Sequence, residues 1–155
     1  MSLPEVSFRL MCATDLESVV ILEQRAYEFP WSRAIITGCT TVPYRIWIGE
    51  IGADKAHVCQ AFLSIVAEEA HILNLSVDPA YQGRGIGNLL LRRLIADAGS
   101  QEAAQIFLEV RESNQAAIQM YLNNDFNEIG RRHNYYPISH GREDALILAL
   151  QLRFD

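Results

Sequence analysis

Clustered metal-ligating residues are missing from this sequence. It has three cysteines, Cys12, Cys39 and Cys59, without a C-x-x-C pair, and its four histidines are scattered. An odd number of widely spaced cysteines predicts neither a disulfide framework nor a zinc site. We therefore expect no bound metal, and the chemistry has to come from other residues.

Two further kinds of pattern are absent. The formal net charge is -6, with 13 basic residues against 19 acidic ones, whereas a nucleic-acid-binding surface needs a basic face. No apolar run reaches membrane length, and the start of the chain has neither a basic n-region nor an apolar h-region. We therefore expect a cytoplasmic protein that binds neither nucleic acid nor a membrane.

Regular elements follow one another along the 155 residues, with no linker or repeat between them. This length suits a single domain over residues 1–155. Alternating and apolar runs predict seven strands, of which the sixth is stopped by Pro137. The predicted strands cover residues 6–11, 44–51, 58–67, 70–77, 104–110, 126–136 and 144–152.

Four helices are predicted between these strands. Thr14 and Glu17 form a capping box before the first, and Ser32 caps a short second helix that ends at Gly38. The third follows a glycine-rich loop, and Asn114 caps the fourth. We expect an α/β (α+β) fold in which about four helices flank a mixed, mostly antiparallel sheet of about seven strands. Inward positions are Leu16, Val19, Val20, Leu22, Ala26, Leu89, Leu90, Ile95, Ala98, Ala117, Ile118, Tyr121 and Leu122.

The stretch from Asn74 to Asn88 organises the rest of the chain. An apolar run ends at Val77, and Gln82-Gly-Arg-Gly-Ile-Gly87 then precedes a new apolar run, which predicts a strand, a glycine-rich loop and a helix start. Glycines let backbone N–H groups approach an anion, and the first helical turn adds unpaired N–H groups. The spacing fits neither a nucleotide P-loop nor a dinucleotide loop. We interpret it as a phosphate site; the alternative is a glycine-rich turn without a ligand.

Two further residues are candidates for acid–base chemistry. Glu109 lies inside the apolar run 106–110, where an unpaired charge is costly. It either forms an ion pair with Arg111 or Arg84, lies at a solvated strand end, or faces a cleft as a proton acceptor. Tyr121 follows Asn114 by almost two helical turns, so it lies on the side of the cap. It either packs in the core or directs its hydroxyl into the same cleft.

These motifs resemble a known enzyme superfamily. The glycine loop is similar to the Q/R-x-x-G-x-G/A pyrophosphate loop of the Gcn5-related N-acetyltransferases (GNAT). Residues 26–32, 108–121, 134–137 and 141–145 together resemble the bacterial family that acetylates the N-terminal alanine of ribosomal protein S18. One departure is Asp125, where that family often has glycine, although aspartate tolerates the left-handed conformation.

The resemblance implies a role for each motif. Glu109 would accept the amine proton through a water, and Tyr121 would protonate the departing thiolate. A backbone N–H near Val77 would polarise the thioester carbonyl. Residues implied to bind acetyl-CoA are Leu75, Ser76, Val77, Gln82, Gly83, Arg84, Gly85, Ile86, Gly87, Asn88 and Asn114.

The implied substrate is the N-terminal peptide of S18, whose α-amine would attack the thioester of acetyl-CoA directly in a ternary complex. We expect the protein to be a monomer. About one α-amine in seven is neutral at pH 7, against about one lysine in a few thousand, so a weak base suits an α-amine. Trp31, Tyr135 and Tyr136 are expected to flank the peptide, with core packing as the alternative for each; for Phe29, on the same loop as Trp31, core packing is favoured. Glu28 or Glu143 is expected to meet a basic residue of the peptide. A small-amine acetyltransferase and a catalytically silent acyl-CoA-binding module remain alternatives.

Overall fold

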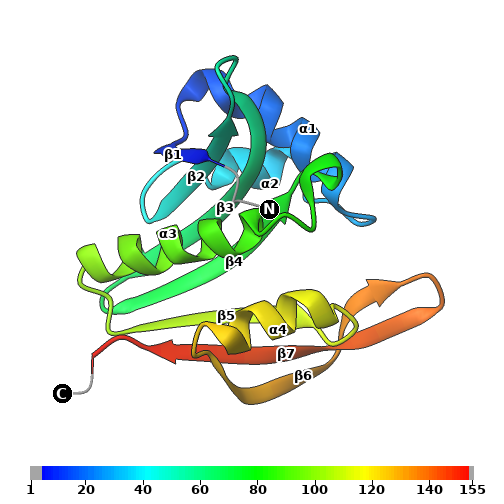
Figure 1. Cartoon of the computed structure of the whole chain (residues 1–155). Coiled ribbons are helices and arrows are strands. Elements are labelled where there is room, and N and C mark those ends of the chain that lie inside the picture. Colours follow the sequence, from blue (N-terminus) through cyan, green and yellow to red (C-terminus); the bar gives the residue numbers. More distant parts are fainter. Residues whose placement is uncertain (1–4, 154–155) are drawn as a thin grey trace.

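One twisted sheet runs through the computed structural model, which describes residues 5–153 (Figure 1). Its seven strands lie in the order β1-β2-β3-β4-β5-β7-β6. Neighbours are antiparallel except for the parallel pair β4 and β5, so the expected mixed, mostly antiparallel sheet is confirmed. The strands are β1 (Val6–Leu10), β2 (Tyr44–Ile51), β3 (Ala56–Val66), β4 (Glu69–Val77), β5 (Gln105–Arg111), β6 (Asn127–Ile138) and β7 (Gly141–Gln151).

Helices cover both faces of this sheet (Figure 1). Successive residues of β3 point to opposite faces: Phe62 packs with the first two helices, whereas Ala61 and Leu63 belong to the larger core under the other two. The helices are α1 (Leu16–Ala26), α2 (Arg33–Gly38), α3 (Ile86–Ser100) and α4 (Gln115–Asn123), with short 3-10 turns at Ala13–Asp15 and Pro79–Tyr81. Within residues 5–153, no helix is long and apolar enough to cross a membrane.

The parallel strands β4 and β5 separate halfway along their length. They pair only from Glu69 to Ile72 on β4 and from Gln105 to Leu108 on β5, and Figure 1 shows them diverging beyond that point. A bulge in β4 accompanies the separation, because Leu73 falls between two residues that pair with β3. The sheet therefore opens at its centre, because β4 beyond Ile72 and β5 beyond Leu108 do not pair with each other.

The predicted capping box at the start of α1 is wrong. Glu17 instead accepts a hydrogen bond from Arg33 at 2.8 Å. Asp15 accepts from the Cys12 N–H at 2.7 Å and from both terminal nitrogens of Arg9. Hydrogen bonds from Arg9 lower the pKa of Asp15 to about 2. The entry to α1 is therefore set by an ion pair with β1, which local spacing does not reveal.

Two smaller expectations are also wrong. Pro137 does not stop β6, because this strand is at the edge of the sheet and continues to Ile138. An edge position tolerates the missing N–H of proline. On α4, Leu122 is exposed, whereas Ile118 and Tyr121 are buried as expected. The helix is short, so its apolar stripe is narrower than predicted.

A buried carboxylate joins α3 to the sheet. Asp97 accepts two hydrogen bonds from Arg45, at 2.7 and 2.8 Å, and one from the Trp47 indole at 2.8 Å. Asp97→Ala should lower the free energy of unfolding by about 3 kcal/mol, because the half-buried Arg45 guanidinium and the Trp47 indole would lose their shared acceptor. Denaturant titration measures this value. The exposed Asp54→Ala is the control, expected to change it by less than about 0.5 kcal/mol; a similar small effect at Asp97 would contradict the prediction.

Candidate active site

The separated ends of β4 and β5 border a cavity of about 300 Å³, which we call the splay cavity. Side chains reach it from the α1–α2 loop, both strands, α4 and β6. It is thus built from segments that are far apart in the chain. Six of the site residues predicted from the sequence line it: Trp31, Leu75, Glu109, Asn114, Tyr121 and Tyr136. Phe29, for which core packing was favoured, is 43% exposed and also lines it.

A second cavity, of about 400 Å³, extends from the same strands toward the β6–β7 hairpin; we call it the hairpin cavity. Both cavities share Trp31, Glu109 and Tyr136, and the hairpin cavity adds Tyr135 and Arg132. Glu109 therefore faces both spaces. The structure brings the predicted carboxylate, phenol and flanking aromatics together at one opening in the sheet.

Glu109 has a partner that the sequence did not indicate. Its Oε1 accepts a hydrogen bond from the Arg132 Nε at 2.6 Å. Of the two expected partners, Arg111 donates to the Pro137 carbonyl at 2.8 Å, and Arg84 lies over the Tyr81 ring. The expected ion pair with Arg111 or Arg84 is therefore wrong, because Glu109 pairs with Arg132 instead. Glu109 also lines both cavities, and its role as a proton acceptor stays a prediction.

Three phenols gather around the splay cavity: Tyr27, Tyr121 and Tyr136. Burial, followed by the proximity of Tyr136, raises the pKa of Tyr121 well above the usual phenol value. Burial likewise raises the pKa of Tyr136 to about 12, and that of Tyr27 above its usual range. All three therefore keep their protons at neutral pH, and the hydroxyls of Tyr27 and Tyr136 donate to the carbonyls of Leu75 and Glu109.

Tyr27 was not predicted from the sequence. Its hydroxyl donates to the Leu75 carbonyl on the separated end of β4. One acceptor site of the backbone expected to pair with pantetheine is therefore already taken by a side chain from the end of α1. Ser76, the next residue, is buried, and Val77 is half-buried with its carbonyl accepting from the Gln82 side chain at 3.0 Å.

Glu23 is a second residue missed by sequence reasoning. It is only 1 % exposed, accepts from the Asn74 amide at 2.7 Å and from the Trp31 N–H at 2.9 Å. Burial raises its pKa. The signal was a carboxylate on the inward face of α1 beside Val20 and Leu22. It ties the loop that carries Trp31 to the separated end of β4.

The glycine loop has the backbone geometry of an anion site. Gly83 and Gly85 have φ angles of 78° and 83°, which glycine adopts without strain. Gly85 is the N-cap residue of α3, so the N–H groups of Ile86, Gly87 and Asn88 lie in the first turn and lack intrahelical acceptors. The side-chain oxygen of Asn88 accepts a hydrogen bond from the Asn124 side-chain amide at 2.7 Å. None of these loop residues lines the two cavities.

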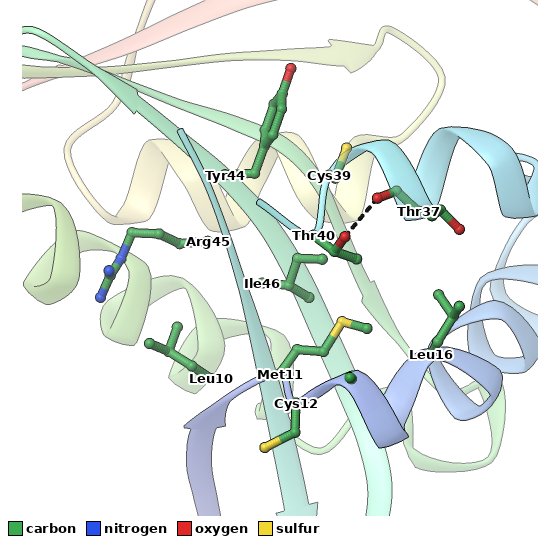
Figure 2. Close-up of a pocket in the computed structure, with 11 residues that line it drawn as sticks. Leu10, Met11, Cys12, Leu16, Thr37, Cys39, Thr40, Tyr44, Arg45 and Ile46 are labelled. Atoms are coloured by element: carbon green, nitrogen blue, oxygen red, sulfur yellow. Dashed lines mark hydrogen bonds between the residues drawn. The ribbon is translucent and has the colours of Figure 1, made fainter. Parts of the chain in front are cut away.

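A third cavity, of about 350 Å³, lies between the end of β1, α2 and the start of β2 (Figure 2). Thr37, Cys39, Thr40 and Ile46 are among its lining residues. The described residues around it include no carboxylate and no histidine, and burial raises the pKa of the Cys39 thiol, which disfavours the reactive thiolate. Its lining therefore offers neither a carboxylate nor a histidine as a proton acceptor, and we expect the chemistry at the opening between β4 and β5.

The sheet order, the glycine loop and the opening between β4 and β5 define an acyltransferase scaffold. Residues 17–126 match the model of the acetyltransferase (GNAT) family. The chain therefore belongs to the GNAT acetyltransferase family, as the sequence motifs indicated.

Particular relatives share nearly its whole length. The chain is 39% identical to the [ribosomal protein bS18]-alanine N-acetyltransferase of Salmonella typhimurium, over 92% of this chain and 95% of that protein. It is 40% identical to the Escherichia coli enzyme of the same name, over 90% and 93%. The crystal structure of the Escherichia coli ribosomal-protein-S18-alanine N-acetyltransferase superposes with a TM-score of 0.91, covering 97% of this chain and 96% of that one.

Proposed function

We propose that this protein transfers the acetyl group of acetyl-CoA to the α-amine of the N-terminal alanine of ribosomal protein S18, in the cytoplasm. The observation that carries the proposal is the meeting of Glu109 and Tyr121 in one cavity at the opening between β4 and β5. A carboxylate and a protonated phenol are the acid–base pair that amide formation from an amine and a thioester uses. The relatives named for this activity support the choice of substrate.

Acetyl-CoA fits the residues present between the glycine loop and the splay cavity. The first turn of α3 presents backbone N–H groups and the positive end of the helix dipole to a pyrophosphate. Gln82 would hold the loop against the end of β4 through its bond to Val77. Free backbone groups on the separated end of β4 would pair with the pantetheine amides. The thioester would supply an activated acetyl group at the splay cavity.

The chain's own residues would then handle two protons. Glu109 would accept the proton of the attacking amine through a water, and the Tyr121 hydroxyl would donate to the departing sulfur. A backbone N–H near Val77, on the end of β4 that does not pair with β5, would polarise the thioester carbonyl. We propose direct transfer, because no cysteine lines either the splay or the hairpin cavity.

The peptide would enter through the hairpin cavity. Trp31 packs on Phe62 with ring centroids 5.2 Å apart, and Tyr135 and Tyr136 lie edge to face at 4.9 Å. These aromatic residues line the hairpin cavity together with Glu109. Glu143, a candidate contact for a basic residue of the substrate, accepts from Ser113 at 2.8 Å.

Intact-mass measurement of peptides tests this function. A peptide with the S18 N-terminal sequence should gain one acetyl group in the presence of protein and acetyl-CoA. The same peptide with a blocked α-amine and a free lysine should gain none, because its remaining amine is almost fully protonated. Spermidine is the small-amine comparison. Acetylation of spermidine alone would replace the peptide with a small amine, and no acetylation together with no thermal stabilisation by acetyl-CoA would defeat the proposal.

A further inference from the structure

Arg132 caps the carboxylate that is proposed to receive the substrate's proton. It lies on β6 and donates from Nε to Glu109 Oε1 at 2.6 Å, across 23 positions of sequence. Both side chains line the hairpin cavity, through which the peptide would enter. A resident cation therefore occupies the carboxylate at the place where an incoming α-ammonium would meet it.

We propose that Arg132 is a displaceable gate on Glu109. In the free protein its guanidinium holds the carboxylate, and it moves into solvent when the α-ammonium of a peptide enters the hairpin cavity. This inference rests on the proposed peptide α-amine activity and assigns Arg132 a role in substrate entry. Through that exchange the gate restricts the site to amines that can take its place.

The contacts of Arg132 make its displacement inexpensive. Its side chain is 56% exposed, and the pair with Glu109 uses one nitrogen and one oxygen. Exposed ion pairs of this kind contribute about 0–1 kcal/mol. The guanidinium also lies 5.4 Å from the centre of the Tyr135 ring, and this aromatic residue is itself exposed. The ion pair is thus weak enough for Arg132 to exchange with an incoming α-ammonium.

The other arginine near Glu109 is held by its own partners. Arg111 is stacked on Tyr136 at 4.5 Å and donates to the Pro137 carbonyl. Two positive charges about 4 Å apart repel each other by about 4 kcal/mol at an intermediate dielectric. This repulsion between Arg132 and an incoming α-ammonium favours the departure of Arg132, which at 56% exposed is the more exposed of the two arginines, against 28% for Arg111.

Steady-state kinetics of Arg132→Gln provide the first test, with Arg131→Gln as the matched control. Arg131 is the neighbouring residue and pairs with Glu112 and Glu128, and its replacement changes the net charge equally. At saturating acetyl-CoA, Arg132→Gln should lower the peptide KM about 5-fold, the equivalent of an exposed ion pair. Its kcat and its KM for acetyl-CoA should stay within about 2-fold of wild type, and Arg131→Gln should match wild type.

Other kinetic results would overturn the gate. A kcat that falls with an unchanged peptide KM would make Arg132 a positioning residue for Glu109. A peptide KM that rises would make it a peptide contact. An equal decrease of the peptide KM in Arg132→Gln and Arg131→Gln would show that the change in net charge causes the effect.

Chemical labelling tests the gate without turnover. A water-soluble carbodiimide with glycine ethyl ester should modify Glu109 several-fold faster in Arg132→Gln than in wild type or Arg131→Gln, as measured by peptide mass spectrometry. Equal rates would overturn the gate. If the wild-type protein failed to acetylate the peptide, the proposed function would fall, and the labelling rates would still decide whether Arg132 shields Glu109.

Discussion

Glu109→Gln should lower kcat by about 100-fold, the lower end of what a general base contributes, while leaving the KM for acetyl-CoA near wild type. Glutamine has the same shape and can still accept the hydrogen bond of Arg132 Nε–H that is now made to Oε1, so the loss isolates proton acceptance. Single-turnover acetylation of the peptide measures it. Glu112→Gln is the control, because Glu112 is exposed, follows the end of β5 and pairs with Arg131.

The pH dependence of the Glu109→Gln variant sharpens this prediction. Without a proton acceptor, the residual rate should follow the neutral fraction of the substrate and rise up to a pH near the α-amine pKa of about 7.8. A kcat within about 3-fold of wild type would remove Glu109 from the proton path. The family assignment would survive that result, because it rests on the fold and the sequence match.

Features with a local cause could be predicted from the sequence. Ser32 accepts from the Ile35 N–H at 3.2 Å, and Asn114 accepts from the Ala117 N–H at 3.2 Å, as their spacing indicated. Asp125 has a φ of 70°, the left-handed conformation expected where related proteins have glycine. In each case the cause lies within a few residues of the effect, so a single sequence contains the full signal.

Features that depend on contacts between distant elements could not be predicted. Glu109 was assigned nearby or loop arginines as partners, yet the sheet order places Arg132 beside it, because β7 and β6 follow β5. Glu23 meets Asn74 across 51 positions. Pro137 reads as a stop until the strand order shows that it lies on an edge. A sequence pattern indicates on which side of a strand or helix a residue lies, whereas the fold determines which residues it contacts.

The site itself divides in the same way. The glycine loop and the pair Glu109 and Tyr121 were identified from motifs. Glu109 and Tyr121 line one cavity, whereas the glycine loop lies outside it, and the roles of these residues stay predictions. The support around them was not identified: Tyr27 on the Leu75 carbonyl and Glu23 on the Trp31 N–H. The local sequence does not indicate the roles of Tyr27 and Glu23, because these roles arise from the separation of β4 and β5.

Tyr121→Phe should lower kcat by about 100-fold as well, by removing the proton donor for the departing sulfur. Burial raises the pKa of the Tyr121 phenol, so the hydroxyl stays protonated throughout the working range. The same burial disfavours a thiolate in the splay cavity, so the proton affinity of the sulfur rises together with that of the phenol. The donor and acceptor thus remain matched in a site where both charged forms are costly.

Two measurements separate this role from packing. Tyr121 is buried against Phe126 with ring centroids 5.6 Å apart, and Phe keeps that ring, so the melting temperature of Tyr121→Phe should equal or exceed wild type. The wild-type rate should also show no decline attributable to Tyr121 below the usual phenol pKa of about 10, because the raised pKa places its ionisation above that value. Tyr44→Phe, which removes a hydroxyl from the third cavity, is the control and should retain full kcat. If Tyr121→Phe lowered both kcat and the melting temperature, Tyr121 would be assigned to the core. If it lowered kcat alone, its hydroxyl would be assigned to the chemistry.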